Sequence, residues 1–250
     1  MTLQQTIETA GKAFIPYIMA GDGGLDTLKP TILKLQELGV TAIEVGIPFT
    51  DPVADGPTIE EAGGRALKQG ANLRSILQTL KSFADEITVP LVAMTYLNPI
   101  LAYGAEQFAI DAAAAGVRGV IVPDMPYEER DIIYPNLKAH NIDLVQLISL
   151  TSPTERIEKL AAASEGFIYA VTVNGITGAR AGFADNLEAH FAKLKAASSI
   201  PVLAGFGIST PEHVQQFNTF SDGVIVGSKI VNSLHTGDWS TIESLIAASK

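Results

Sequence analysis

One glutamate of this sequence, Glu44, combines a chemically active group with a position that shields it from water. It stands in the run Thr41-Ala-Ile-Glu-Val-Gly46, whose branched apolar residues are typical of a strand. Successive side chains of a strand point to opposite faces, so Glu44 lies on the face opposite Ile43 and Val45. If the branched residues face covering helices, Glu44 points into the interior, where poor hydration raises the pKa of a carboxyl and suits it to proton transfer near neutral pH. A glutamate that only makes a structural hydrogen bond fits the same pattern.

Two aspartates, Asp51 and Asp55, follow this strand in the segment Ile47-Pro-Phe-Thr-Asp-Pro-Val-Ala-Asp-Gly-Pro57, which contains three prolines. Proline restricts the backbone, so the loop is expected to be stiff. A stiff loop suits a carboxylate that must be positioned against a reacting group. Aspartate is also a common turn residue because it hydrogen-bonds its own backbone. Either role is therefore open for each of the two aspartates.

Three glycine-rich turns come late in the chain, and each follows an expected strand. They contain Gly178, then Gly205 with Phe206 and Gly207, and then Gly227 with Ser228. Backbone N–H groups of such turns, together with a helix N-terminus, can bind a phosphate, and glycine lets the backbone approach it closely. One such turn is often only a tight connection, whereas three at one face of a barrel favour a phosphate site. A site of this kind needs no Lys or Arg.

Other polar side chains give weaker signals. Tyr17 and Tyr169 lie in expected strands, where each either lines a site or fills the core. Asp124 follows another expected strand, where it either caps a loop or contacts the site. The four histidines lie in or beside expected helices without metal-ligand spacing, so we expect them at the surface and predict no bound metal.

Short β-branched runs alternate with longer helical patterns along the whole chain. We expect strands at Ala13–Met19, Thr41–Gly46, Pro90–Thr95, Gly119–Val122, Asp143–Ile148, Gly166–Val171, Pro201–Ala204 and Gly223–Val226. Several are almost continuously apolar, as in a parallel sheet covered by helices. Eight such strands in 250 residues predict a single (β/α)8 TIM barrel over residues 1–250, with extra short helices, in the α/β class. A doubly wound open sheet is the alternative, but the turn Ala20–Gly24 lacks the Gly-x-Gly-x-x-Gly spacing of its phosphate loop.

Composition excludes several classes of function. The chain has 17 Lys and Arg against 27 Asp and Glu, a net charge of −10, which is a poor match for nucleic acid or an anionic membrane. It has no cysteine, so disulfides, thiolate metal sites and cysteine nucleophiles are excluded. No apolar stretch reaches membrane-spanning length, and residues 1–12 do not look like a signal peptide. We therefore expect a cytoplasmic protein.

Taken together, these segments resemble the alpha subunit of tryptophan synthase. The matching stretches are Phe14–Tyr17 with Gly21-Asp22, Ile43–Ile59, Asn98-Pro99, Val122–Pro126, Gly175–Ala179, Gly205–Ser209 and Gly227-Ser228. They span nearly the whole chain in the expected order. The string Glu-x-Gly-x-Pro-Phe-x-Asp-Pro-x-Ala-Asp-Gly-Pro is long and specific.

The resemblance implies a barrel that cleaves indole-3-glycerol phosphate to indole and glyceraldehyde 3-phosphate in a retro-aldol reaction of tryptophan biosynthesis. It assigns proton transfer to Glu44 and stabilisation of positive charge at the indole N–H to Asp55. It places Tyr17 against the indole and Tyr169 near the catalytic glutamate. The implied phosphate site comprises Gly178, Gly207, Gly227 and Ser228, with Gly205 and Phe206 alongside.

The resemblance also implies a partner. The family's beta subunit carries pyridoxal phosphate and condenses indole with serine, and the usual assembly contains two alpha and two beta chains. No cofactor is then expected in this chain. Asp51, the 48–57 loop and the 97–104 segment would face the beta subunit.

Three other functions remain as alternatives at this point. The first is a stand-alone indole-3-glycerol phosphate lyase that releases free indole. The second is another phosphate-binding barrel enzyme, such as a phosphosugar isomerase or epimerase, which the string around Glu44 and Asp55 disfavours. The third is a catalytically silent activator of a beta subunit.

Overall fold

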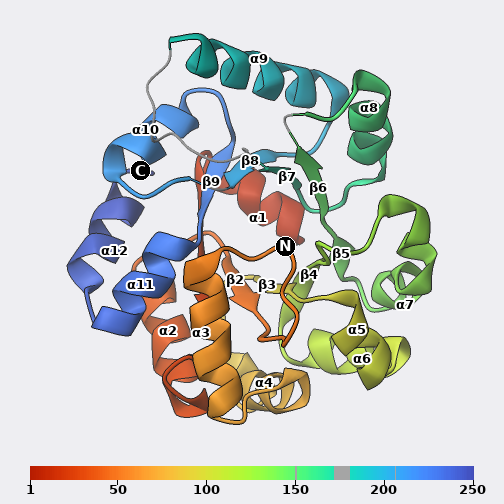
Figure 1. Cartoon of the computed structure of the whole chain (residues 1–250), viewed down its shortest axis with the longest axis vertical. Coiled ribbons are helices and arrows are strands. Elements are labelled where there is room, and N and C mark those ends of the chain that lie inside the picture. Colours follow the sequence, from red (N-terminus) through yellow and green to blue (C-terminus); the bar gives the residue numbers. More distant parts are fainter. Residues whose placement is uncertain (150, 172–180, 206) are drawn as a thin grey trace.

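Parallel strands form a curved sheet that closes on itself into a barrel. The computed structural model describes residues 1–149, 151–171, 181–205 and 207–250. Within them the strand order is β5-β4-β3-β2-β1-β9-β8-β7-β6, and every pairing is parallel (Figure 1). The strands are β1 Ala13–Met19, β2 Ile43–Gly46, β3 Leu91–Met94, β4 Val117–Ile121, β5 Asp143–Leu144, β6 Gln146–Ser149, β7 Ile168–Val171, β8 Val202–Gly205 and β9 Gly223–Val226.

The predicted barrel is confirmed, with one difference in the strand count. The segment Asp143–Ile148 was expected as one strand, but residues 143–149 are divided at Val145 into β5, which pairs with β4, and β6, which pairs with β7. Val145 donates its N–H to Val120 O at 3.0 Å, so the chain remains attached to β4 at the division. The ring therefore closes through this one segment, which changes partner halfway along.

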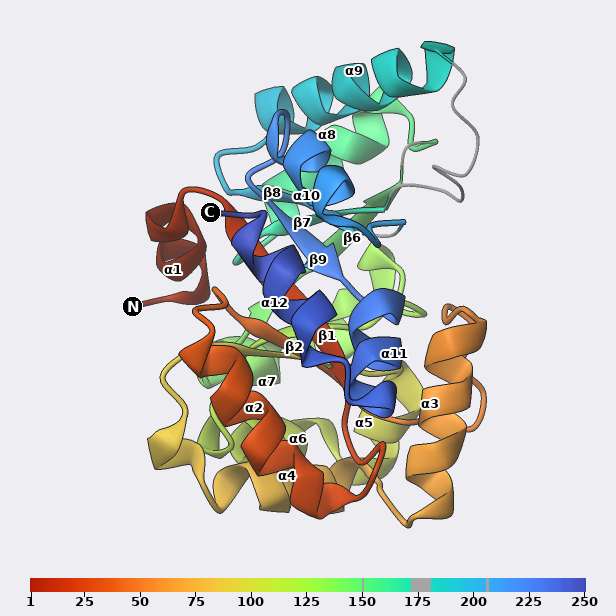
Figure 2. The ribbon, with the colours of Figure 1, turned by 90° about the vertical axis from the view of Figure 1, so that its left-hand side faces the viewer.

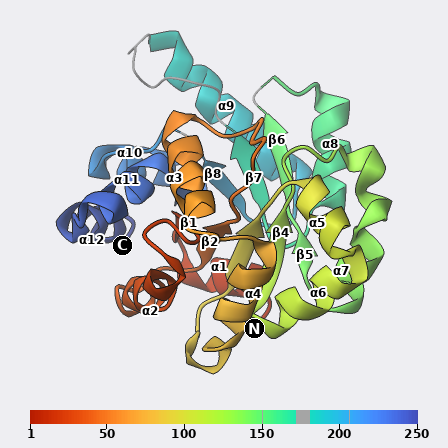
Figure 3. The ribbon, with the colours of Figure 1, turned by 60° about the horizontal axis from the view of Figure 1, so that its bottom comes forward.

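Helices surround the sheet and cover its outer surface (Figures 1 and 3). They are α1 Leu3–Ala10, α2 Leu28–Glu37, α3 Pro57–Lys68, α4 Leu73–Lys81, α5 Leu97–Tyr103, α6 Ala105–Ala114, α7 Tyr134–Ala139, α8 Thr154–Ala163, α9 Ala181–Ala197, α10 Pro211–Asn218, α11 Ser228–Thr236 and α12 Trp239–Ala247. Short 3-10 turns are η1 Leu25–Thr27, η2 Ala84–Glu86 and η3 Tyr127–Ile132. Figure 2 shows α3 and α11 side by side along one flank. No helix among the described residues is long and apolar enough to span a membrane.

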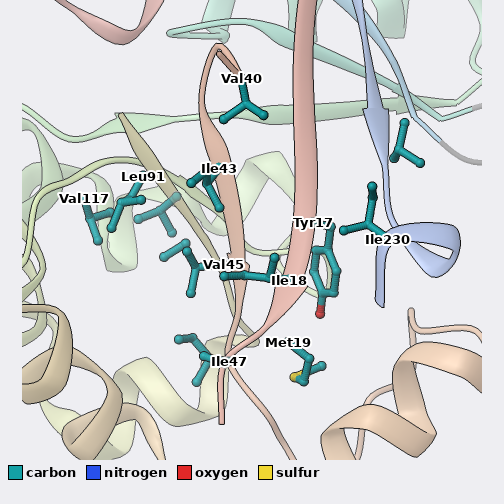
Figure 4. Close-up of a cluster of buried hydrophobic side chains, with 14 of the residues drawn as sticks. Tyr17, Ile18, Met19, Val40, Ile43, Val45, Ile47, Leu91, Val117 and Ile230 are labelled. Carbon is teal, nitrogen blue, oxygen red and sulfur yellow. The ribbon is translucent and has the colours of Figure 1, made fainter. Parts of the chain in front are cut away.

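Strand alternation divides the core into an outer and an inner layer. In β2, Ile43 and Val45 belong to the outer layer between sheet and helices, and Figure 4 shows them beside Ile47 on this strand. Ala42 belongs to the inner layer, the cluster enclosed by the barrel. The period of two then points Glu44 inward, as predicted.

Helix α1 closes the N-terminal end of the barrel, which we call the floor. Its side chains Leu3 and Ile7 are buried in the inner layer, and Figure 1 shows α1 over the middle of the ring. Two glycines make room for it. A methyl group on Gly119 or Gly166 would come within 2.7 or 2.8 Å of the Leu3 side chain. The opposite end, where the strands finish, is the mouth, and in barrels of this kind it carries the active site.

Candidate active site

Glu44 is a buried carboxyl group at the mouth of the barrel. Its side chain comes from β2, and the residue is 1% exposed. Neither carboxyl oxygen has a hydrogen-bond partner among the described residues. Burial, and then the negative charge of Asp55, raise the pKa of Glu44 from 4.5 to about 8. The group is therefore mostly protonated at neutral pH and can both give and take a proton there.

Asp55 is held next to this carboxyl by a tyrosine that the sequence reasoning missed. Tyr96, which follows β3, donates its hydroxyl to Asp55 Oδ1 at 2.9 Å and accepts the Ala54 N–H at 3.1 Å. Burial raises the pKa of Asp55, the hydrogen bond from Tyr96 opposes this rise, and the charge of Glu60 adds to it. The available signal for Tyr96 was its place directly after an expected strand, where barrel site residues occur.

Two further tyrosines line the space around Glu44. Tyr17 is the register partner of Glu44 across β1 and β2, and a methyl group on Gly46 would lie 1.9 Å from its hydroxyl. The Tyr17 phenol therefore lies across the end of β2, and Figure 4 shows its hydroxyl directed toward that end. Tyr169 on β7 packs in the same way against Gly205, where a methyl group would meet its ring at 2.1 Å.

The charges of these side chains act on one another. Burial raises the pKa of Tyr17 well above its usual value, and the charges of Asp55 and Glu44 raise it further. Burial and then Glu44 have the same effect on Tyr169. Glu44, Asp55, Tyr17 and Tyr169, all predicted from the sequence, thus lie close enough for their charges to act on one another, and Tyr96 joins them through Asp55.

The late glycine turns lie at the same end of the barrel. Gly205 ends β8, Gly207 has a left-handed φ of 77°, and Gly227 is the residue before α11, which begins at Ser228. A methyl group on Gly227 would come within 3.9 Å of Tyr17 Cβ, so the N-terminus of α11 lies beside β1. Its free N–H groups suit an anion. Gly178 and Phe206, also predicted here, lie outside the described residues.

Two other predicted residues can be placed. Asp51 is exposed in the loop after β2, where Thr50 donates its hydroxyl to Asp51 Oδ2 at 2.6 Å. Asp124 accepts the Leu97 N–H at 2.9 Å, so it caps the start of α5.

The expectation that all four histidines lie at the surface is wrong for His190. This residue is 6% exposed, because α9 buries it in one stripe with Leu187, Phe191 and Leu194. Burial lowers the pKa of His190. Within the described residues, no cluster of three or more His, Asp or Glu could hold a metal ion.

The fold and these side chains define the class of the protein: a (β/α)8 barrel with a buried carboxyl and glycine-containing turns at one mouth. The chain belongs to the tryptophan synthase alpha chain family, whose model matches residues 3–248. A tryptophan synthase alpha chain of Bacillus cereus (strain ATCC 10987 / NRS 248) is 52% identical over 248 residues, covering 99% of this chain and 96% of that protein. A Bacillus anthracis alpha chain is 51% identical with the same coverage.

Solved structures agree with these sequence matches. The tryptophan synthase subunit alpha from Legionella pneumophila str. Paris superposes with a TM-score of 0.90 and 32% identity, covering 100% of this chain and 98% of that one. A Mycobacterium tuberculosis tryptophan synthase structure gives a TM-score of 0.89 at 33% identity, covering 99% and 97%.

Family membership establishes the reaction. The chain is an enzyme of tryptophan biosynthesis that catalyses the lyase half-reaction, the cleavage of indole-3-glycerol phosphate. The family also implies a beta-subunit partner. The matches do not favour the stand-alone lyase, and they replace the phosphosugar isomerase as an interpretation of the barrel.

Proposed function

We propose that Glu44 carries out both proton transfers of the cleavage. The protonated carboxyl gives its proton to C3 of the indole ring, which leaves the ring cationic and able to accept electrons. The resulting carboxylate takes the proton of the side-chain hydroxyl next to the ring. The carbon–carbon bond then breaks, its electron pair returns to the indole, and the hydroxyl carbon becomes the aldehyde. The observation that carries this proposal is a buried carboxyl that has a pKa of about 8 and no hydrogen-bond partner among the residues that the structure describes.

Asp55 is proposed to accept a hydrogen bond from the indole N–H and to stabilise the positive charge that develops there. Its proximity to Glu44, expressed in the charge effect of Asp55 on the Glu44 pKa, supports this role. Tyr17 would pack against the indole, and Tyr169 would contact the substrate beside Glu44. Both are buried next to Glu44, as these roles require.

The phosphate of the substrate is proposed to bind Gly205, Gly207, Gly227 and Ser228, with Gly178 and Phe206 completing the site. The support is the helix N-terminus at Ser228, next to Tyr17. A phosphate held there anchors the far end of the substrate and fixes the reacting bond against Glu44. This chain then needs neither a cofactor nor a metal for its own reaction.

The partner is proposed to be a beta subunit that carries pyridoxal phosphate, in an assembly of two alpha and two beta chains in the cytoplasm. Asp51, the 48–57 loop and the 97–104 segment would form the contact. The apolar side chains of Val53 and Leu101 support this surface, because they are 81% and 46% exposed and come from these two segments. Exposed apolar residues of this kind are typical of a surface that a partner covers.

The test is the rate of glyceraldehyde 3-phosphate release from indole-3-glycerol phosphate, with and without a tryptophan synthase beta subunit. Slow release that rises strongly with beta supports the proposal. Asp55→Asn should lower the rate by roughly 10²–10³-fold in both conditions. Fast release that beta does not change would favour the stand-alone lyase, and full activity of Asp55→Asn would remove Asp55 from the mechanism.

The same assay tests the contact surface. Asp51→Asn should weaken activation by beta while leaving the KM of the isolated chain unchanged. Equal losses in the isolated chain and in the complex would place Asp51 in the substrate site instead.

A further inference from the structure

Within the described part of the chain, the Tyr96 side chain makes the hydrogen bonds that join the Asp55 loop to the barrel. The Tyr96 hydroxyl bonds two consecutive loop residues, accepting from Ala54 and donating to Asp55. Among the described residues, the other hydrogen bonds of residues 50–56 stay within the loop or join it to the start of α3. Most of this loop is exposed. Without Tyr96, therefore, its backbone would have little to hold it over the mouth.

Tyr96 itself is firmly placed. It is 3% exposed, and it lies two residues after the end of β3, which is paired with β2 and β4. The next residue, Leu97, gives its N–H to Asp124, which fixes the turn from strand to helix. The ring of Phe49 packs on the Tyr96 ring with centroids 5.4 Å apart. Tyr96 thus contacts both ends of the loop, Phe49 at its start and Asp55 near its end.

We propose that Tyr96 is a positioning residue for the cleavage reaction, which fixes Asp55 by occupying Oδ1 and leaves Oδ2 to accept the substrate's N–H. This inference rests on the role proposed above for Asp55. Among the described residues Oδ2 accepts no hydrogen bond, so it is available. Fixing one oxygen aims the other, and a carboxylate already aimed at the reacting group loses less freedom when the substrate binds.

The same hydrogen bond keeps Asp55 charged. Burial and Glu60 raise the pKa of Asp55, and the Tyr96 hydroxyl opposes them. The titratable groups around Asp55 are Tyr96 after β3, Glu44 on β2, Tyr17 on β1 and Glu60 on α3. None of these is a cation. Removal of the hydroxyl should therefore raise the pKa of Asp55 and move the acidic limb of the kcat/KM profile to higher pH.

A double-mutant cycle tests the inference, using wild type, Tyr96→Phe, Asp55→Asn and the double variant in the complex with a beta subunit. Tyr96→Phe should lower kcat by about 10- to 100-fold, as expected for a hydrogen bond to a charged group. In the Asp55→Asn background the same change should lower kcat by less than about threefold, because Tyr96 acts through Asp55. The acidic limb of Tyr96→Phe should lie at higher pH than that of wild type.

Tyr134→Phe is the matched control. Tyr134 also donates its hydroxyl to a carboxylate, Glu165 at 3.0 Å, but at the floor of the barrel. Its kcat and pH profile should stay within about twofold of wild type. The urea midpoint of each variant, measured alongside, separates loss of folded protein from loss of function.

Two outcomes would overturn the inference. If Tyr96→Phe lowered kcat by the same factor in both backgrounds, Tyr96 would not act through Asp55. An unmoved acidic limb would mean that the hydroxyl does not set the charge of Asp55. Full activity of the Asp55→Asn single variant would instead overturn the proposed role of Asp55. That result does not depend on any Tyr96 variant.

Discussion

Two glutamates at opposite ends of the barrel, Glu165 and Glu44, differ in how their carboxyl groups are hydrogen-bonded. At the floor, Glu165 accepts from Tyr134 at 3.0 Å, from Lys138 at 2.5 Å and from the Leu144 N–H at 3.5 Å. At the mouth, Glu44 is more deeply buried, and neither of its oxygens has a partner among the described residues. Glu165, just before β7, therefore connects α7 and β5 through its hydrogen bonds. Glu44 makes no such connection within the described residues.

This difference separates a carboxyl that builds the fold from one that reacts. A buried polar group without a partner destabilises the folded state, so native proteins rarely keep one unless it has a function. At the floor, Glu165 accepts hydrogen bonds from both α7 and β5, as expected for a carboxylate with a structural role. The exception at Glu44 is therefore the strongest structural sign of the reaction.

The largest expected effect comes from replacing the carboxyl group at each end by an amide. Glu44→Gln should lower the cleavage rate by about 10²–10⁴-fold without loss of stability, because the amide keeps the shape and cannot shuttle a proton. Glu165→Gln should leave the rate unchanged and lower the free energy of unfolding by about 1 kcal/mol, since its ion pair with Lys138 is partly exposed. Product release and urea unfolding of both variants measure these effects. A lower cleavage rate in Glu165→Gln would show that the floor glutamate also contributes to the reaction.

The pH dependence of stability should come mainly from Glu44 at the mouth. The folded state binds the Glu44 proton more tightly than the unfolded state, with pKa values of about 8 and 4.5. The free energy of unfolding should then fall as the pH rises from about 4.5 to about 8, by roughly 4–5 kcal/mol at most. Asp143, with a pKa raised to about 6 by burial and by Glu165, adds a slope of the same sign at the floor.

Glu44→Gln isolates the contribution of the mouth to this slope. Urea unfolding at pH 5, 6.5 and 8 should show wild type losing more stability than the variant, with the residual slope assigned to the remaining groups. Parallel curves for the two proteins would show that Glu44 has an ordinary pKa.

The smallest effects compare two glycines. Gly46→Ala should push the Tyr17 ring away from the end of β2, because the added methyl would lie 1.9 Å from its hydroxyl. We expect a stability loss of about 1–3 kcal/mol and a higher KM. Gly64→Ala in α3 meets no atom within 4 Å, so it should raise stability by up to about 1 kcal/mol with unchanged kinetics. Kinetics and thermal unfolding of the two variants decide this, and a normal KM for Gly46→Ala would mean that Tyr17 does not contact the substrate.

Local covalent rules explain what the sequence could predict. The inward direction of Glu44 follows from the period of a strand, and the barrel follows from repeated apolar strands separated by helices. The sequence also contains the signal for burial of His190. It shares a helical spacing of i, i+3, i+4 and i+7 with three apolar residues, Leu187, Phe191 and Leu194. The prediction that His190 lies at the surface was therefore wrong.

Long-range contacts explain what the sequence could not predict. The hydrogen bond between Tyr96 and Asp55 joins residues 41 positions apart, and it depends on the path of an irregular loop. The division of the segment 143–149 at Val145 arises from closure of the whole ring, a property that no single segment carries. Roles of individual site residues, such as Ser228 in phosphate binding, likewise stay predictions.

The helix at the floor decides how molecules enter and leave. With Leu3 and Ile7 filling the N-terminal end, the described part of the barrel is closed at its floor. Substrate that reacts beside Glu44 is then expected to enter, and both products to leave, on the side of the mouth. One product is an uncharged apolar ring and the other carries a phosphate, so the two are expected to leave the mouth at different rates. Release of the slower product, rather than cleavage of the bond, can then limit turnover.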